Sequence, residues 1–125
     1  MRKYTVKMNV EEIREYCLSK PGTNESFPFD DTTLVFKVIS RMFALLSLAG
    51  DNFINLKCDP EKAIQLREEK SYVLPGYHMN KEQWNSVYFD HAGDQELREW
   101  IDHSYELIKE KLPKKDREIL DGRSG

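Results

Sequence analysis

Three apolar runs rich in strand-forming residues follow one another in the middle of the chain, with only short turns between them. The runs cover residues 33–39, 42–48 and 53–58. The first turn holds Ser40 and Arg41, and the second contains Gly50 and Asp51, which tolerate positive φ. Turns this short join antiparallel neighbours. The pattern therefore predicts an antiparallel three-stranded meander over residues 33–58.

The two faces of this meander differ in polarity, because side chains alternate between the faces along a strand. The apolar face carries Leu34, Phe36, Val38, Ile54, Leu56 and Cys58. The other face is partly polar and carries Lys37, Asn55 and Lys57. We expect helices to pack against the apolar face and the second face to be open or only partly covered.

Helical patterns with recognisable ends flank the meander along the chain. The expected helices have N-caps at Asn9, Asp59 and Asp94, and they end before Pro21, at about Lys70 and at Pro113. Between the last two helices, residues 84–89 alternate as a fourth strand, and residues 72–77 form a turn or a short edge segment. This order predicts an α+β sandwich, in which an antiparallel sheet of four to five strands has helices packed on one face.

Length and composition limit the class of protein. A chain of 125 residues, 39% of them hydrophobic, fits one compact domain, which we place at residues 1–113. Residues 114–125 lack a periodic pattern and are expected to form a mobile tail. The longest apolar stretch is far shorter than the roughly 20 residues that cross a bilayer, and the N-terminus lacks the apolar segment of a secretory signal. We therefore expect no membrane contact and a cytoplasmic location.

Charge and motifs argue against several functions. The formal net charge is −3, so any nucleic-acid binding must rely on a local basic patch. The sequence contains no G-x-S-x-G, no H-E-x-x-H and no phosphate-binding glycine-rich loop. Its three histidines are too far apart in sequence to form a local metal motif. Cys17 and Cys58 form no CxxC unit and are expected to be reduced core thiols. We expect a protein that is not an enzyme and has no cofactor.

The densest group of unusual residues lies between Pro75 and Asn85. His78, Asn80 and Lys81 bring an imidazole, an amide and an ammonium close in sequence to Trp84, a mixture that can contact phosphate, sugar or bases. The same residues also suit structural roles, such as a turn, a helix cap and a packed aromatic ring. The sequence leaves both interpretations open.

Several segments resemble sequences of the MmcQ/YjbR family of small bacterial proteins. They are V-F-K-V at 35–38, M-F-A-L-L at 42–46, N-L-K-C-D-P at 55–60, P-G-Y-H-M-N-K at 75–81 with W-N at 84–85, and I-D-H-S-Y at 101–105. The resemblance covers about residues 9–115. It implies a CyaY-like (frataxin-like) fold and DNA binding through a double-wing arrangement of hairpins and loops.

The partner that the resemblance implies is double-stranded DNA. The expected nucleic-acid-binding residues are Lys37, Arg41, Lys57, His78, Asn80, Lys81 and Trp84, the last as a support or stacking platform. Because the chain is acidic overall, few phosphates would be neutralised, and binding is expected to be weak and steeply dependent on salt.

The alternatives come from a different class of function. Frataxin-like domains present an acidic surface of their first helix to iron, and Glu11, Glu12 and Glu15 would be its counterparts here. Carboxylates are also favoured at any helix N-terminus because of the helix dipole. A metal-binding domain of this kind, or a protein-interaction module without ligand chemistry, is the alternative to DNA binding.

Overall fold

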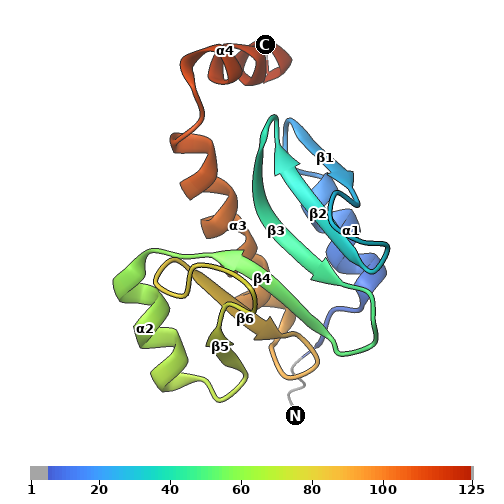
Figure 1. The fold of residues 1–125 in the computed structure, drawn as a ribbon, viewed down its shortest axis with the longest axis vertical. Coiled ribbons are helices and arrows are strands. Elements are labelled where there is room, and N and C mark those ends of the chain that lie inside the picture. Colours follow the sequence, from blue (N-terminus) through green and yellow to red (C-terminus); the bar gives the residue numbers. More distant parts are fainter. Residues whose placement is uncertain (1–5, 125) are drawn as a thin grey trace, which may run out of the picture.

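The computed structural model describes residues 6–124, which form four helices and six strands (Figure 1). The helices are α1 (Val10–Leu18), α2 (Pro60–Glu69), α3 (Asp94–Glu110) and α4 (Lys114–Ser124). The strands are β1 (Thr23–Ser26), β2 (Thr33–Val38), β3 (Arg41–Ser47), β4 (Phe53–Lys57), β5 (Val73–Pro75) and β6 (Trp84–Tyr88). The chain is an α+β single domain, as its pattern predicts.

All six strands belong to one antiparallel sheet, with the order β1-β2-β3-β4-β6-β5. The predicted meander is confirmed as β2, β3 and β4, and the predicted fourth strand is confirmed as β6 beside β4. The ambiguous segment 72–77 supplies β5 at one edge. The sheet has more strands than the four to five expected.

The strand that the pattern did not predict is β1, at the other edge. Its sequence, Thr-Asn-Glu-Ser, has no apolar alternation. It forms because its backbone pairs with β2, from Thr23 opposite Val38 to Ser26 opposite Val35. The neighbouring strand supplies these hydrogen bonds, so the segment itself needs little strand propensity.

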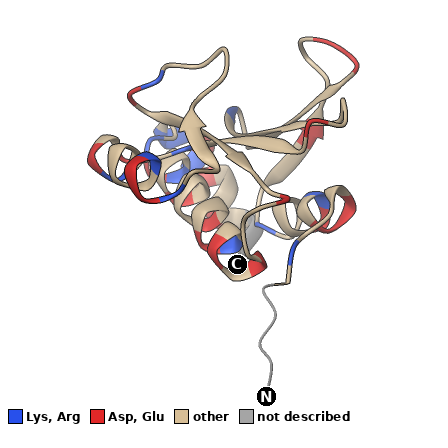
Figure 2. Ribbon diagram, turned by 90° about the horizontal axis from the view of Figure 1, so that it is seen from below, with Lys and Arg blue, Asp and Glu red and all other residues tan. Residues whose placement is uncertain are grey.

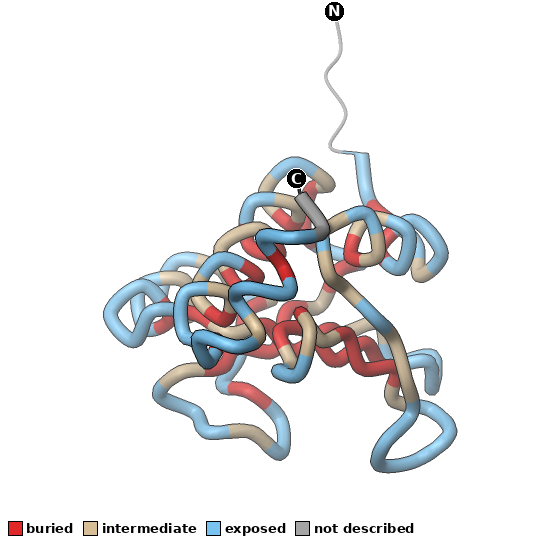
Figure 3. Tube along the Cα trace, turned by 90° about the horizontal axis from the view of Figure 1, so that it is seen from above, coloured by how far each residue is buried: buried red, intermediate tan, exposed pale blue. Residues whose placement is uncertain are grey.

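One apolar core lies between the sheet and the helices on one of its faces. The residues fully buried there include Ile13 of α1, Phe36 and Phe43 of the sheet, and Leu97 and Ile101 of α3. Figure 3 shows the buried residues concentrated where the sheet meets these helices. A polar side chain of α3 also ties the two layers together: Ser104 Oγ donates to the carbonyl of Phe43 at 2.5 Å and accepts the N–H of Lys57 at 2.9 Å.

The pairing of β2 with β3 contains a bulge that decides which residues reach each face. The register shifts between Phe36, which pairs with Ala44, and Lys37, which pairs with Met42. Phe43 is therefore left between two paired residues, and both Phe43 and Ala44 belong to the core. Met42 then packs with the opposite face of the sheet.

Local signals at the helix ends behave largely as expected. Asn9 forms a capping box with Glu12, and the Asp59 side chain caps α2 in front of Pro60. The N-cap of α3 is Gly93 rather than the predicted Asp94, because the Glu96 carboxylate accepts the Gly93 N–H at 2.9 Å. None of the helices within residues 6–124 is both long enough and apolar enough to span a membrane.

The expected mobile tail contains helix α4, which contacts the domain. Leu120 is 2% exposed and belongs to the core. It sits so close to Gly22 that a Cβ on this glycine would lie 2.6 Å from its Cδ1 and 3.0 Å from Cδ1 of Ile39. The Ser40 hydroxyl also donates to Asp116. The sequence pattern did not predict this helix because, among its described side chains, only Leu120 is buried, so no repeating apolar stripe marks it.

The second face of the sheet carries no helix and is only partly covered, as predicted. Figure 2 shows the helices on one side of the sheet and two loops rising on the other. These are loop 27–32, between β1 and β2, and loop 76–83, between β5 and β6. Between them lies a small apolar cluster of Val35, Leu45 and Trp84.

Candidate functional site on the open face of the sheet

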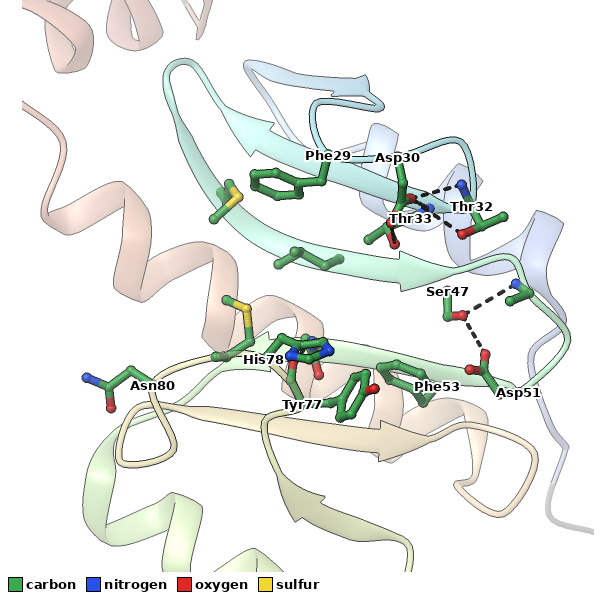
Figure 4. A pocket seen from close by; sticks show the side chains of 15 residues that line it. Phe29, Asp30, Thr32, Thr33, Ser47, Asp51, Phe53, Tyr77, His78 and Asn80 are labelled. Carbon is green, nitrogen blue, oxygen red and sulfur yellow. Dashed lines mark hydrogen bonds between the residues drawn. The ribbon is translucent and has the colours of Figure 1, made fainter.

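A groove of about 710 Å³ lies on the open face between loop 27–32 and loop 76–83 (Figure 4). It is lined by Phe29, Asp30, Thr32, Thr33, Met42, Leu45, Ser47, Ala49, Asp51, Phe53, Asn55, Tyr77, His78, Met79 and Asn80. Strands β3 and β4 supply its floor, and the two loops supply its walls. Sites for small molecules usually have this size and a mainly apolar lining with a few polar groups.

Asp30 shapes the first wall of the groove. Its carboxylate accepts the N–H groups of Thr32 and Thr33 at 2.9 and 2.7 Å, which closes the turn into β2 (Figure 4). These hydrogen bonds, led by the one from Thr32, hold the pKa of Asp30 below its ordinary value. The neighbouring Phe29 is 64% exposed, so an aromatic ring lies at the groove in water.

The second wall, loop 76–83, begins at Gly76, where the surrounding atoms leave no room for a larger side chain. A Cβ on Gly76 would lie 2.8 Å from Cβ of Trp84 and 2.9 Å from its carbonyl oxygen. The Lys81 ammonium closes the loop by donating to the Gly76 carbonyl at 2.9 Å. At the tip, His78 has a positive φ of 58°, and its ring lies 4.0 Å from that of Tyr77.

Buried polar groups beneath the second wall hold it onto the sheet. Asn55, which is buried, donates through Nδ2 to the carbonyl of Tyr77 at 3.0 Å and accepts a hydrogen bond from the Ser86 hydroxyl. Ser86 in turn accepts the N–H of Tyr77 at 2.9 Å. The Tyr77 ring then meets Phe53 edge to face, with centroids 6.0 Å apart. The wall is positioned without a ligand.

A group of cations lies near the end of the sheet where β2 turns into β3: Lys57 is on the open face beside Trp84, Arg41 pairs with the core residue Val38, and Lys111 directly follows α3. Arg41 of β3 and Lys111, just after α3, are near enough to Lys57 of β4 to lower its pKa by like-charge repulsion, although burial is the larger cause. We call Arg41, Lys57 and Lys111 the cation cluster. Among the described residues, none of the three has a carboxylate within ion-pair distance. Lys37 lies on the open face, at the same end of the sheet as Lys57.

The structure divides the predicted nucleic-acid-binding residues between these two places. Arg41, Lys57 and Lys37 lie at the cation end, whereas His78 and Asn80 line the groove. Figure 4 shows Asn80 pointing away from the cavity, and its side chain caps a turn by accepting the Glu82 N–H at 2.9 Å.

Trp84 and Lys81 have structural contacts. Trp84 is only 8% exposed, so it suits the predicted role of a support rather than that of a stacking platform. The Lys57 ammonium lies 5.9 Å from the centroid of its ring and donates to Gln83 Oε1 at 2.6 Å. Lys81 holds loop 76–83 through its ammonium, and its carbonyl accepts from Arg67 at 2.7 Å.

Sequence reasoning missed several residues that line the two places. Phe29, Phe53, Tyr77 and Asp51 line the groove, and Lys111 joins the cation cluster. One available signal was the segment Phe-Pro-Phe-Asp-Asp at 27–31, because large aromatic residues are unusual in a polar loop unless they pack or bind. Lys111 could not be distinguished from other lysines near a helix C-terminus.

The metal ligands expected on α1 are exposed residues of that helix, and one of them caps it. Glu12 accepts the Asn9 N–H at 3.1 Å, so its carboxylate serves the capping box. Within residues 6–124, no three His, Cys, Asp or Glu side chains are arranged to hold a metal ion. Glu11 and Glu12 lie in the first turn of α1 and Glu15 lies further along it, all three exposed to water, and the metal-binding alternative stays a prediction.

Comparisons with known proteins place the chain in a family. The family model described as YjbR matches residues 18–107. Uncharacterised protein YjbR of Escherichia coli K12 is 33% identical over 115 residues, which cover 90% of this chain and 98% of that protein. Uncharacterised protein YbdF of Escherichia coli O157:H7 is 37% identical over 109 residues, covering 86% of this chain and 89% of YbdF.

A solved structure supports the same relation. The crystal structure of Deinococcus radiodurans protein DR2400, described with the domain DUF419, superposes with a TM-score of 0.84 at 37% identity and covers 96% of this chain and 92% of that one. A protein from Pseudomonas syringae superposes with a TM-score of 0.69 at 28% identity, covering 80% of this chain and 98% of that chain. The chain belongs to the YjbR family.

Proposed function

We propose that this protein binds nucleic acid, contacting the phosphate backbone with the cation cluster and Lys37, and that it catalyses no reaction. The observation that carries the proposal is the Lys57 ammonium, which lies on the open face beside Trp84 and Gln83, has Arg41 and Lys111 near enough to repel it, and, like them, has no carboxylate within ion-pair distance among the described residues. Cations that repel one another favour an incoming anion, and phosphate oxygens accept hydrogen bonds from both ammonium and guanidinium groups.

The titratable groups of the described chain favour binding over covalent chemistry. Burial raises the pKa of Cys17 to about 12 and that of Cys58 to about 11, so neither thiol is an activated nucleophile. His103, whose pKa is lowered mainly by burial, accepts the Asp59 N–H at 3.3 Å. It is engaged in a structural contact next to α2 rather than facing the groove.

The distribution of charge sets the strength and the extent of the contact. The cation cluster lies at one end of the sheet, with Lys57 and Lys37 on the open face, whereas Asp30 and Asp51 lie at the other end of that face, where β2 begins and β3 ends. A long duplex laid along the strands would bring its phosphates against these carboxylates. We therefore propose a short contact at the cation end, with up to about four phosphates neutralised, one for each cation, and a slope of log K against log salt of about −3 to −4.

Fluorescence anisotropy with a labelled DNA duplex, measured over a series of salt concentrations, tests this proposal. The double substitution R41A/K111A removes two exposed cations of the cluster and is expected to weaken binding and to reduce the salt slope by about 2. The matched control K7A/K70A removes the same charge near the N-terminal end of α3, away from the cluster, and should leave the slope unchanged.

Two results would reject the proposal. One is an absence of any anisotropy change at low salt with both the duplex and a single strand of the same sequence. The other is an equal loss of affinity in the control and in the cluster variant, which would show that net charge alone drives the contact. A comparison of duplex with single strand then decides which form of DNA the open face accepts.

A further inference from the structure

The groove differs in charge from the cation cluster beside it. Its lining contains two carboxylates, Asp30 and Asp51, and no lysine or arginine. It also contains the rings of Phe29, Phe53 and Tyr77. A phosphate in this groove would meet two carboxylates and, apart from the imidazole of His78, no basic side chain, so the groove does not suit the ligand that the cation cluster suits.

The apolar part of the groove is exposed to water although its walls are held in place. Phe29 is 64% exposed and Tyr77 is 58% exposed, on opposite walls. Leu45 and Met42 lie between them on the floor. The hydrogen bonds of Asp30 fix the first wall, and those of Asn55 fix the second. A preformed apolar site of this kind gains free energy when a ligand removes its rings from water.

Asp51 supplies a charged group at one end of this apolar space. Its Oδ1 accepts the Ser47 hydroxyl, and its Oδ2 has no hydrogen-bond partner among the described residues. Figure 4 shows Asp51 at the same end of the groove as Phe53. The second carboxylate, Asp30, is engaged by Thr32 and Thr33 but keeps its charge, because the same hydrogen bonds lower its pKa.

We propose that the groove binds a small organic cation, whose apolar body lies between the aromatic walls and whose ammonium group lies at Asp51. Charge complementarity selects a cation, and aromatic faces add to that preference because their quadrupole attracts positive charge. The volume of about 710 Å³ suits a small molecule. This site is independent of the contact proposed for nucleic acid.

A matched set of ligands tests the proposal on the intact protein by NMR chemical-shift titration and calorimetry. The probes are 2-phenylethylammonium, neutral 2-phenylethanol and anionic 3-phenylpropionate, which share a ring but differ in charge. We expect the ammonium to bind most tightly, with shifts confined to the groove lining, and the carboxylate not to bind. Equal affinity for the ammonium and the alcohol, or shifts spread over the surface, would overturn the proposal.

Two pairs of variants measure separately how the Asp51 charge and the aromatic rings contribute to binding. D51N should weaken binding of the ammonium about three- to fivefold, while D31N, which removes a charge from the neighbouring loop outside the lining, should change it less than about twofold. Y77A should weaken both the ammonium and the alcohol, and the ammonium more because it also loses the attraction of the ring for positive charge, whereas F27A removes an exposed ring outside the lining and should weaken neither. Equal effects of D51N and D31N would reject the assigned role of Asp51.

The nucleic-acid experiment provides the final comparison. D51N should not weaken the binding of DNA, and R41A/K111A should not weaken the binding of 2-phenylethylammonium. If R41A/K111A abolished both, the groove and the cation cluster would be a single site, and the proposal of a separate cation groove would be wrong.

Discussion

At the scale of single residues, a few buried polar side chains decide how the open face is shaped. Asn55 is buried, yet each of its polar atoms has a partner, in Tyr77 and in Ser86. A buried amide is stable only when it is hydrogen-bonded, so its position also fixes its partners. In this protein one such residue connects the floor of the groove to the wall that rises from it.

Replacement of Asn55 by alanine should therefore be costly. N55A removes the donor to the Tyr77 carbonyl and the acceptor of the Ser86 hydroxyl, which keeps only the bond from the Tyr77 N–H, and we expect a loss of about 1–3 kcal/mol in the free energy of unfolding. Urea denaturation measures this loss. The control N24A removes a hydrogen bond from the exposed Asn24 to the Ile39 carbonyl and should cost less than about 1 kcal/mol. Similar losses in the two variants would contradict the argument.

At the scale of elements, helix α4 illustrates how little contact attaches a segment to a domain. It is held by the buried Leu120, by the hydrogen bond from Ser40 to Asp116 and by the bond from Arg117 to the Glu110 carbonyl at 3.1 Å. The turn that it covers contains Ile39 at a φ of 55°, which is unfavourable for a β-branched residue. Packing around this turn offsets the strain.

The attachment of α4 depends mainly on one side chain. We expect L120A to lower the free energy of unfolding by about 2 kcal/mol, because it leaves a cavity beside Gly22 and Ile39. Hydrogen exchange should become faster in α4 while β4 keeps its protection. The control I119A alters a neighbouring residue that is 43% exposed, and it should change neither measurement. Unchanged exchange in L120A would show that other contacts hold the helix.

At the scale of the whole molecule, the open face is divided by charge. Cations gather where β2 turns into β3, and carboxylates lie at the opposite end of the same strands. A formal net charge of −3 conceals this division, because opposite charges cancel in a sum and not in space. The two ends therefore present opposite charges to a ligand. The CyaY-like assignment stays a prediction.

Stability of the whole molecule should fall at both extremes of pH. Hydrogen bonds from Arg14 and from the Thr32 backbone lower the pKa values of Glu25 and Asp30, so their contribution is present above the ordinary carboxyl pKa and is lost as the pH falls. Burial, assisted by hydrogen bonds to Asp102 and Glu96, raises the pKa values of Tyr16 and Tyr72 to about 12. Their contribution is present below the ordinary tyrosine pKa of about 10 and is lost as the pH rises towards 12.

Urea denaturation at a series of pH values measures the loss of stability at both the acid and the alkaline extreme. The variant Y16F removes one of the two hydroxyls whose pKa is raised, so its free energy of unfolding should fall less steeply as the pH rises. It also removes the 2.5 Å hydrogen bond from Tyr16 to Asp102. An alkaline decline as steep in Y16F as in the unmodified protein would show that Tyr16 does not contribute to it.

The features that the sequence predicts are those that depend on neighbours along the chain. Alternating runs predict β2, β3, β4 and β6, and capping residues predict where the first helices start. The family resemblance is confirmed for the same reason, since it rests on short segments. Lys57 and Arg41 were identified as candidate contacts, but their sequence positions did not show that Lys111 lies near both.

The sequence by itself determined the order and type of most elements, because alternation and capping are local properties of the backbone. Only the tertiary structure decided that Thr23–Ser26 is a strand, that α4 packs on a strained turn, and that Phe29 faces Tyr77 across a groove. Each of these depends on partners far away in the chain, whose identity no local pattern encodes. The candidate sites of this protein are made almost entirely from such distant pairs.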